Sequence, residues 1–132
     1  MEVKIDTKEK FTVVTPVQAL LSDNIAAIVA GTCTEQLQKD VKNVVLNLSS
    51  VNMLENGAAA VLADLQQQFY DANHSFVICC LQPGVEQKLD ELELLEILNI
   101  TPTESEAWDI VQMEEIEREL LDGEDMEFEK ND

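Results

Sequence analysis

Hydrophobic and polar residues alternate at the start of the chain. Apolar Val3 and Ile5 are interleaved with charged residues, which is typical of a half-exposed strand. Residues 11–14 predict a second strand, and the charged pair Glu9 and Lys10 falls between the two. The first residues therefore predict a β-hairpin.

A helical pattern follows the hairpin. Ser22, Asp23 and Asn24 are all residue types that cap a helix N-terminus. The apolar residues that come next recur at helical spacing, as far as the charged residues 39–40. We expect one buried helix face made of Ile25, Ile28, Val29, Cys33 and Leu37.

Strand and helix patterns then alternate. Residues 44–48 are a short apolar run rich in β-branched residues, which predicts a central strand covered on both faces. A stripe at i, i+3, i+4 and i+7 predicts a helix that starts at Asn56. Residues 76–81 predict a second buried strand, and Pro83 and Gly84 end it before another helix.

The last elements complete an α/β pattern. Residues 97–100 predict a short strand, and Thr103 with Glu106 three residues later predicts the capped start of a final helix. We expect that helix to use one apolar stripe, formed by Ile110, Met113, Ile116 and Leu120. The order ββαβαβαβα predicts a single α/β domain with a mixed, mainly parallel sheet of about five strands and packed helices.

Composition and charge narrow the class of protein. The chain has 132 residues, 45% of them hydrophobic, which fits one globular domain. It carries 27 acidic and 8 basic residues, a net charge of −19. This charge would repel nucleic acid and anionic lipid, so we expect neither as a partner. No secretory signal or membrane-spanning run is visible, and we expect a cytoplasmic protein with no membrane insertion.

The acidic residues concentrate at the C-terminal end. Residues 112–132 contain ten acidic residues against Arg118 and Lys130. We expect a domain over 1–121 and an acidic tail over 122–132 that is frayed past Gly123. A solvating role explains such a tail, and electrostatic steering toward a basic partner is the alternative.

Candidate chemistry is sparse. No nucleotide-binding, nucleophile-elbow or zinc-protease motif occurs, and we expect no catalytic residues and no cofactor. Cys79 and Cys80 are expected to point to opposite faces of a strand, so they would not converge on a metal ion, and we expect none. A hydrolase or phosphatase that uses Glu55 with His74 is the remaining enzymatic alternative.

One segment resembles a known family. Residues 44–62 read VVLNLSSVNMLENGAAAVL, which is similar to the strand, loop and helix start of STAS domains, the module of sulphate transporters and bacterial anti-sigma factor antagonists. The family pattern there is VVLDLS-V-F-DSSGL-VL. The resemblance extends over about residues 1–112, through residues 76–85 and the Leu94–Ile100 stretch. It implies the same order of elements as the hydrophobic pattern.

The resemblance also marks a position that differs. The family's Asp-Ser-Ser-Gly-Leu-Gly corresponds here to Glu55, Asn56, Gly57, Ala58, Ala59 and Ala60. In the family the first serine is the phosphorylation site, and phosphorylation releases a protein partner. An amide cannot be phosphorylated, so the resemblance implies that Asn56 imitates the unphosphorylated, binding-competent form. Residues 16–21 also lack the Gly and Asp that relatives carry there.

Several functions follow from these observations. The resemblance implies a non-enzymatic regulatory protein in bacterial transcription that docks an anti-sigma factor or kinase through Glu55 to Ala60. A second function is an accessory STAS subunit on the ATPase of an ABC-type membrane transporter. A purely structural alternative makes Asn56 a helix cap and uses the alanines 58–60 for close helix packing.

Overall fold

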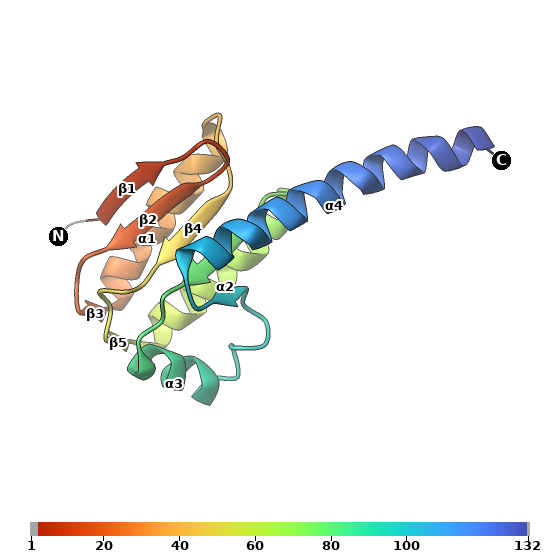
Figure 1. Cartoon of the computed structure of the whole chain (residues 1–132). Coiled ribbons are helices and arrows are strands. Elements are labelled where there is room, and N and C mark those ends of the chain that lie inside the picture. The colour runs from red at the N-terminus through yellow and green to blue at the C-terminus, as the bar shows by residue number, and fades with distance from the viewer. Residues whose placement is uncertain (1–2, 132) are drawn as a thin grey trace.

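The computed structural model describes residues 3–131, and the side chains of residues 3–121. Strands and helices alternate along the chain (Figure 1). The elements are β1 (Val3–Thr7), β2 (Thr12–Pro16), β3 (Leu20–Leu21), α1 (Asp23–Glu35), a 3-10 turn (Gln36–Gln38), β4 (Val44–Asn47), β5 (Met53–Leu54), α2 (Asn56–Asp71), β6 (Phe76–Cys79), α3 (Pro83–Glu91), β7 (Ile100–Thr101) and α4 (Glu104–Asn131).

Five strands form the main sheet, in the order β1-β2-β4-β6-β7. β1 is antiparallel to β2, and the other neighbours are parallel. This confirms the predicted α/β fold, its mixed five-stranded sheet and the central place of β4. The two-residue strands β3 and β5 form a separate parallel pair that the sequence pattern does not predict.

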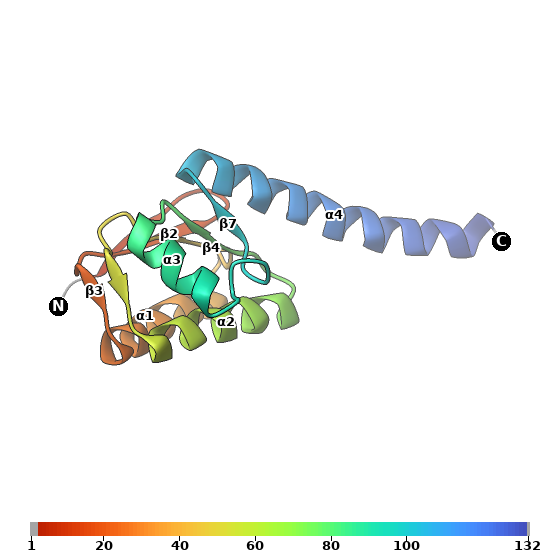
Figure 2. The same ribbon diagram turned by 90° about the horizontal axis from the view of Figure 1, so that it is seen from below.

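Helices cover both faces of the sheet. Figure 2 shows α1 and α2 on one side and α4 on the other. Successive residues of β4 alternate between the two cores: Leu46 belongs to the larger core with α1 and α2, and Val45 belongs to the smaller core under α4. The continuous apolar run of this strand follows from its burial on both faces.

α2 crosses the larger core with a continuous buried stripe. The side chains that pack inward are Ala58, Ala59, Leu62, Leu65 and Phe69. Phe69 and Phe76 of β6 hold their ring centroids 5.4 Å apart, in a tilted arrangement. The helix starts at Asn56 as predicted. The buried stripe begins with Ala58 in its first turn, so packing against the core holds that turn in place.

α1 buries a narrower face than the sequence predicts. Ser22 is its N-cap, and the Ser22 hydroxyl oxygen accepts from the Ile25 N–H at 3.2 Å. Ala26, Val29 and Cys33 are buried, and burial raises the pKa of the Cys33 thiol to about 12. Ile28 is 43% exposed. It lies about 200° around the helix from Ala26, so the prediction that it joins the buried face is wrong.

The predicted strand at 97–100 is shifted toward the C-terminus. Residues 94–98 form turns, with the N–H groups of Ile97 and Leu98 both donating to the Leu94 carbonyl oxygen. The strand is the pair Ile100–Thr101, and Ile97 is 60% exposed. The first apolar residues of this run therefore belong to turns, and only Ile100 belongs to the strand.

Cys79 and Cys80 do not point to opposite faces. Cys79 is the last residue of β6, and Cys80 follows it with a φ of 63°, in the left-handed region. This turn of the backbone brings the two sulfur atoms to 3.6 Å, so the prediction of opposite faces is wrong. Burial raises the pKa of the Cys79 thiol. Within the described part of the chain, no group of three His, Cys, Asp or Glu residues is placed to hold a metal ion.

α4 packs on the sheet through a different face from the one predicted. Its start is capped as expected, because the Thr103 hydroxyl oxygen accepts from the Glu106 N–H at 3.2 Å. The residues buried against the sheet are Ala107 and Val111, and Trp108 stacks on Phe11 with ring centroids 5.1 Å apart. The predicted stripe is wrong as a buried face, because Met113, Ile116 and Leu120 are each more than half exposed.

The C-terminal segment continues as helix. The backbone remains helical to Asn131, where the sequence predicts fraying past Gly123. The division into a domain over 1–121 and an acidic tail over 122–132 stays a prediction, and residue 132 lies outside the described residues. None of the helices in the described part of the chain has the length and apolar character needed to cross a membrane.

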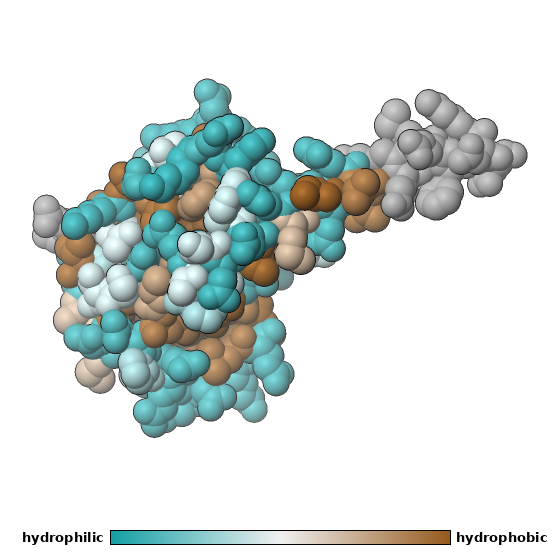
Figure 3. Space-filling model, in the orientation of Figure 1, coloured by the Kyte–Doolittle hydropathy of each residue, from teal (hydrophilic) through white to brown (hydrophobic). Residues whose placement is uncertain are grey.

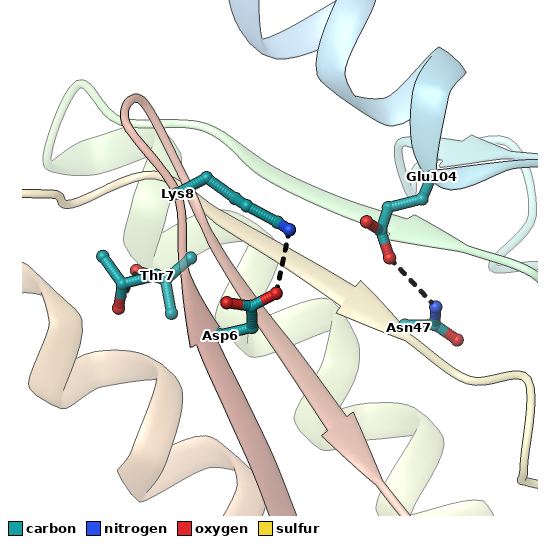
Figure 4. Close-up of polar contacts among 6 residues, drawn as sticks. Asp6, Thr7, Lys8, Asn47 and Glu104 are labelled. Atoms are coloured by element: carbon teal, nitrogen blue, oxygen red, sulfur yellow. Dashed lines mark hydrogen bonds and ion pairs between the residues drawn. The ribbon is translucent and has the colours of Figure 1, made fainter.

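A polar contact joins α4 to the sheet at its first turn. The Asn47 amide donates to the Glu104 carboxylate at 3.3 Å, which ties the end of β4 to the start of α4 (Figure 4). On the β1–β2 hairpin, Lys8 and Asp6 form an ion pair at 2.9 Å, and this contact raises the pKa of Lys8. Because Asn47 ends β4 and the chain then leads through β5 into α2, the starts of α4 and α2 both follow the carboxyl end of β4.

Candidate functional site

The start of α2 is the place where sequence and structure both concentrate candidate residues. The chain leaves β4 at Asn47, passes through β5 and enters α2 at Asn56. Free backbone N–H groups and the positive end of the helix dipole lie at such a helix start. In a mostly parallel sheet, the carboxyl ends of the strands are also where binding sites gather.

The six predicted site residues separate into two groups. Glu55, Asn56, Gly57 and Ala60 are exposed, and they are available to a partner. Ala58 and Ala59 are fully buried. The inclusion of these two alanines among partner-contacting residues is therefore wrong, because they face the core from the first turn of α2 and serve close packing of the helix.

Glu55 supports the start of the neighbouring helix. Its carboxylate oxygen accepts from the backbone N–H of Asp23, the first residue of α1, at 2.8 Å. Glu55 also holds the N-cap position of α2, with an extended backbone but no side-chain bond to that helix. One acidic residue therefore joins the two helix starts, and its negative charge faces the positive end of α1.

Replacing Glu55 by alanine should lower the free energy of unfolding by about 0.5–2 kcal/mol, because the first turn of α1 loses its cross-helix acceptor. Urea unfolding measures this difference. Glu55→Gln keeps a side-chain oxygen that can accept from the Asp23 N–H, so it should retain most of the stability. Equal unfolding curves for the wild type and Glu55→Ala would contradict the capping role.

Asn56 is the first residue inside α2 and not its cap. Its side-chain oxygen accepts from the Lys88 ammonium group at 3.1 Å. Lys88 lies in the last turn of α3, so this bond links the start of α2 to the end of α3, between residues 32 positions apart. The capping role that the purely structural alternative gave to Asn56 is therefore wrong, because Glu55 holds the N-cap position and the Asn56 amide is bonded to α3.

Sequence reasoning missed Lys88. A signal for it exists, since Lys88 is the only lysine or arginine between positions 43 and 117. A single lysine in such an acidic stretch is a candidate to bond a polar side chain at the start of α2. The position of α3 beside α2 could not be read from the sequence, so the pairing with Asn56 could not be predicted.

Two glycines lie at close approaches near the starts of α2 and α3. A Cβ atom on Gly57 would lie 2.5 Å from the nearest carboxylate oxygen of Asp23. A Cβ atom on Gly84, at the start of α3, would lie 2.5 Å from the carbonyl oxygen of Asn52. The backbone of α3 thus comes close to Asn52, whereas at Gly57 the close neighbour is the exposed carboxylate of Asp23 at the start of α1.

Two exposed apolar residues lie beside the helix start, and sequence reasoning missed them as well. Leu20 of β3 and Met53 of β5 are paired neighbours, 43% and 63% exposed. Each belongs to a two-residue strand, which leaves no periodic signal. We define the α2 docking surface as the exposed residues around this helix start: Leu20, Met53, Glu55, Asn56, Gly57 and Ala60.

Glu55 and His74 are too far apart to act together. They flank opposite ends of α2, which has 16 residues. A helix of that length spans about 24 Å, whereas proton transfer between two groups needs hydrogen-bond distance. The enzymatic alternative built on this pair is therefore wrong.

His74 instead lies half-buried at the far end of α2. Burial lowers its pKa, and the positive charges of Arg118 and Lys42 lower it further, against the opposing effect of Glu115. The expectation of a solvated surface histidine is thus only partly right. The position is close to two cationic groups, and neither belongs to the α2 docking surface.

His74 should make the stability depend on pH. Because its pKa is lower in the folded state, the unfolded chain binds more protons as pH falls through the ordinary histidine range. Acidification from about pH 7.5 to about 5.5 should therefore destabilise the wild type relative to His74→Gln. Urea unfolding at several pH values tests this. A difference between the two proteins that stays constant with pH would contradict the pKa direction.

Comparison with models of protein families matches residues 2–107 to the STAS domain. Since this match spans most of the chain, the chain belongs to the STAS domain family. Comparison with curated proteins by sequence finds no match. The family resemblance of residues 44–62 is thereby confirmed.

Solved structures share the fold at low identity. A candidate anti-sigma factor antagonist of Thermotoga maritima has a TM-score of 0.74 at 20% identity, over 83% of this chain and 94% of its own. The anti-sigma factor antagonist SpoIIAA in its unphosphorylated form has a TM-score of 0.67 at 13% identity, over 84% and 96%. The murine anion transporter Slc26a9 has a TM-score of 0.65 at 14% identity, over 78% of this chain and 18% of the transporter.

Proposed function

We propose that this chain is a non-enzymatic regulatory module that docks a protein partner through the α2 docking surface without phosphorylation control. The observation that carries the proposal is the neutral amide of Asn56, exposed at the start of α2 and bonded to Lys88. The STAS family membership and the fold of anti-sigma factor antagonists support it.

The surface has the chemistry of a protein-binding site. Exposed Leu20 and Met53 offer apolar area, and Glu55 and Asn56 give polar groups beside it. Apolar centres with polar surroundings are usual in protein interfaces. The partner that fits best is an anti-sigma factor or its kinase, because the structural neighbours are antagonists of such proteins.

The Asn56 amide supports binding that is permanently available. A phosphate on a serine would add about −1.5 to −2 charges at the helix start and disturb a docked partner. Asn56 adds no charge, and its side-chain oxygen already accepts a hydrogen bond from the Lys88 ammonium group. The chain would then be regulated by its amount or by competing partners, and not by a kinase acting at this position.

A second candidate function is that of an accessory module on a membrane transporter. The observation that favours it is the structural likeness to part of the anion transporter Slc26a9. The ATPase of an ABC-type transporter would be the partner of a separate STAS chain in this case. The same α2 docking surface would be used, so only the identity of the partner distinguishes the two functions.

Affinity capture from the native cell tests the proposal. Tagged wild type is compared with Asn56→Arg, and with Gln68→Arg as a matched control that adds the same charge at an exposed position later on α2. We expect one partner to bind the wild type and the control and to be lost with Asn56→Arg. Identification by mass spectrometry separates an anti-sigma protein from a transporter ATPase. A partner that still binds Asn56→Arg would contradict the proposed docking surface.

A further inference from the structure

The solvent-facing side of α4 carries an uncovered apolar stripe. Met113, Ile116 and Leu120 are 56%, 54% and 56% exposed and recur at intervals of three and four residues. They lie on the opposite side of the helix from Ala107 and Val111, which pack on the sheet. Figure 3 shows hydrophobic residues on the part of α4 that borders the grey residues.

This stripe lies where α4 leaves the domain. Figures 1 and 2 show the helix continuing well past the edge of the sheet. A helix that extends beyond its domain is marginally stable in water by itself, and helices are normally stabilised by packing of an apolar face. A second helix laid along the stripe would remove its apolar surface from water and supply that packing.

The charges beside the stripe select the occupant. Glu117 and Glu119 are exposed and flank it on the helix surface, and exposed Asp109 lies on its line one turn before Met113. Residues 112–131 hold nine acidic and two basic residues, so two copies of this helix would repel each other. A helix with lysine or arginine on both sides of its apolar face would be attracted instead.

A hollow next to the stripe provides a second, independent indication. It has a volume of about 320 Å³ and lies between α4 and the β1–β2 turn. Ile116 and Trp108 line it together with the acidic residues Glu9, Glu115 and Glu119, of which Glu115 also accepts from the Asn43 amide, and Lys10 is the only basic residue in its wall. An apolar wall with several carboxylates fits a long basic side chain, whose stem can pack on the ring while the cation meets the acids.

We propose that the apolar stripe of α4 and this hollow are a docking site for a basic amphipathic helix of a partner protein. Helix-in-groove recognition of this kind uses apolar anchors at i, i+3 and i+7, which is the spacing of Met113, Ile116 and Leu120. The site lies on the opposite face of the sheet from α2. It is therefore separate from the α2 docking surface and does not depend on the proposed function.

A tryptophan-free model peptide tests the proposal. The probe is an 18-residue helix of leucine and lysine with the leucines on one face, titrated into the full chain while the emission of Trp108, the only tryptophan, is recorded. The protein variant Met113→Gln/Ile116→Gln/Leu120→Gln removes the stripe at unchanged charge. Ile5→Gln/Ile28→Gln/Ile97→Gln is the matched control, because these three residues are also exposed and lie elsewhere.

We expect saturable binding to the wild type, a Kd at least tenfold higher for the stripe variant, and a change of at most twofold for the control. A peptide of the same composition with the leucines scattered around the helix should bind at least tenfold more weakly. Equal affinity for the scattered peptide, or for the stripe variant, would overturn the proposal, because attraction would then be purely electrostatic. A wild-type dimer in sedimentation that the stripe variant loses would also overturn it, since a second copy would then be the occupant.

Discussion

Replacing Phe69 by alanine should lower the free energy of unfolding by about 3–5 kcal/mol, the range for removing a buried aromatic ring. Phe69 is fully buried on α2, and its ring packs against Phe76 of β6. A typical domain is stable by about 5–15 kcal/mol, so this variant should approach the limit of folding. Urea or thermal unfolding followed by circular dichroism measures the loss.

The adjacent residue supplies the control. Tyr70 is 73% exposed, and Tyr70→Ala should change the free energy of unfolding by at most about 0.5 kcal/mol. The pair tests whether α2 is held in the fold by the stripe described above. Similar losses for Phe69→Ala and Tyr70→Ala would mean that the helix packs through another face, and the position of Asn56 would then be wrong.

The second large effect is expected at Asn56. Asn56→Asp should weaken partner binding at least tenfold. Docking would remove water from the new carboxylate, and the partner is not expected to offer a positive group to pair with it. The helix dipole and Lys88 favour this charge, whereas Glu55 and Asp23 oppose it. We therefore expect stability within about 1 kcal/mol of the wild type. Surface plasmon resonance with the captured partner measures the affinity.

Asn56→Ser separates charge from shape. This variant is neutral, and it introduces a hydroxyl at the position that the family resemblance aligns with a phosphorylated serine. It should bind the partner within a few-fold of the wild type, and it should become sensitive to phosphorylation only when a kinase is supplied. Tight binding by both the serine and the aspartate variants would contradict the idea that negative charge at position 56 controls docking.

The main architecture could be predicted because it depends on long, repeated patterns. The buried run of β4 and the stripe from Ala58 to Phe69 each place several apolar residues at the spacing of their element. The start of α2 at Asn56 followed from the same stripe. Family resemblance in residues 44–62 then gave the position of the candidate site within the fold.

Features that depend on contacts between distant segments could not be predicted. The strands β3 and β5 are two residues long, so their apolar members, Leu20 and Met53, carry no periodicity. The bond from Lys88 to Asn56 requires the placement of α3 beside α2. Local spacing alone therefore did not reveal these neighbours of Asn56.

The exposed stripe of α4 was mispredicted for a related reason. Met113, Ile116 and Leu120 have the periodicity of a buried face, and periodicity does not say which of two faces meets the sheet. The small side chain of Ala107 permits α4 to approach the sheet, while the larger apolar residues remain outside. A conflict between pattern and burial is expected where a surface serves binding.

Hydrogen exchange of the complex with the captured partner tests the central claim most directly. Backbone amides of residues 19–24 and 52–60 surround the α2 docking surface, and each can be compared between the free and the bound chain. Docking at the start of α2 predicts slower exchange in both segments on binding, with no such change in the Asn56→Arg variant. Protection confined to α4, with residues 52–60 unchanged, would contradict the account and place the partner on the opposite face of the sheet.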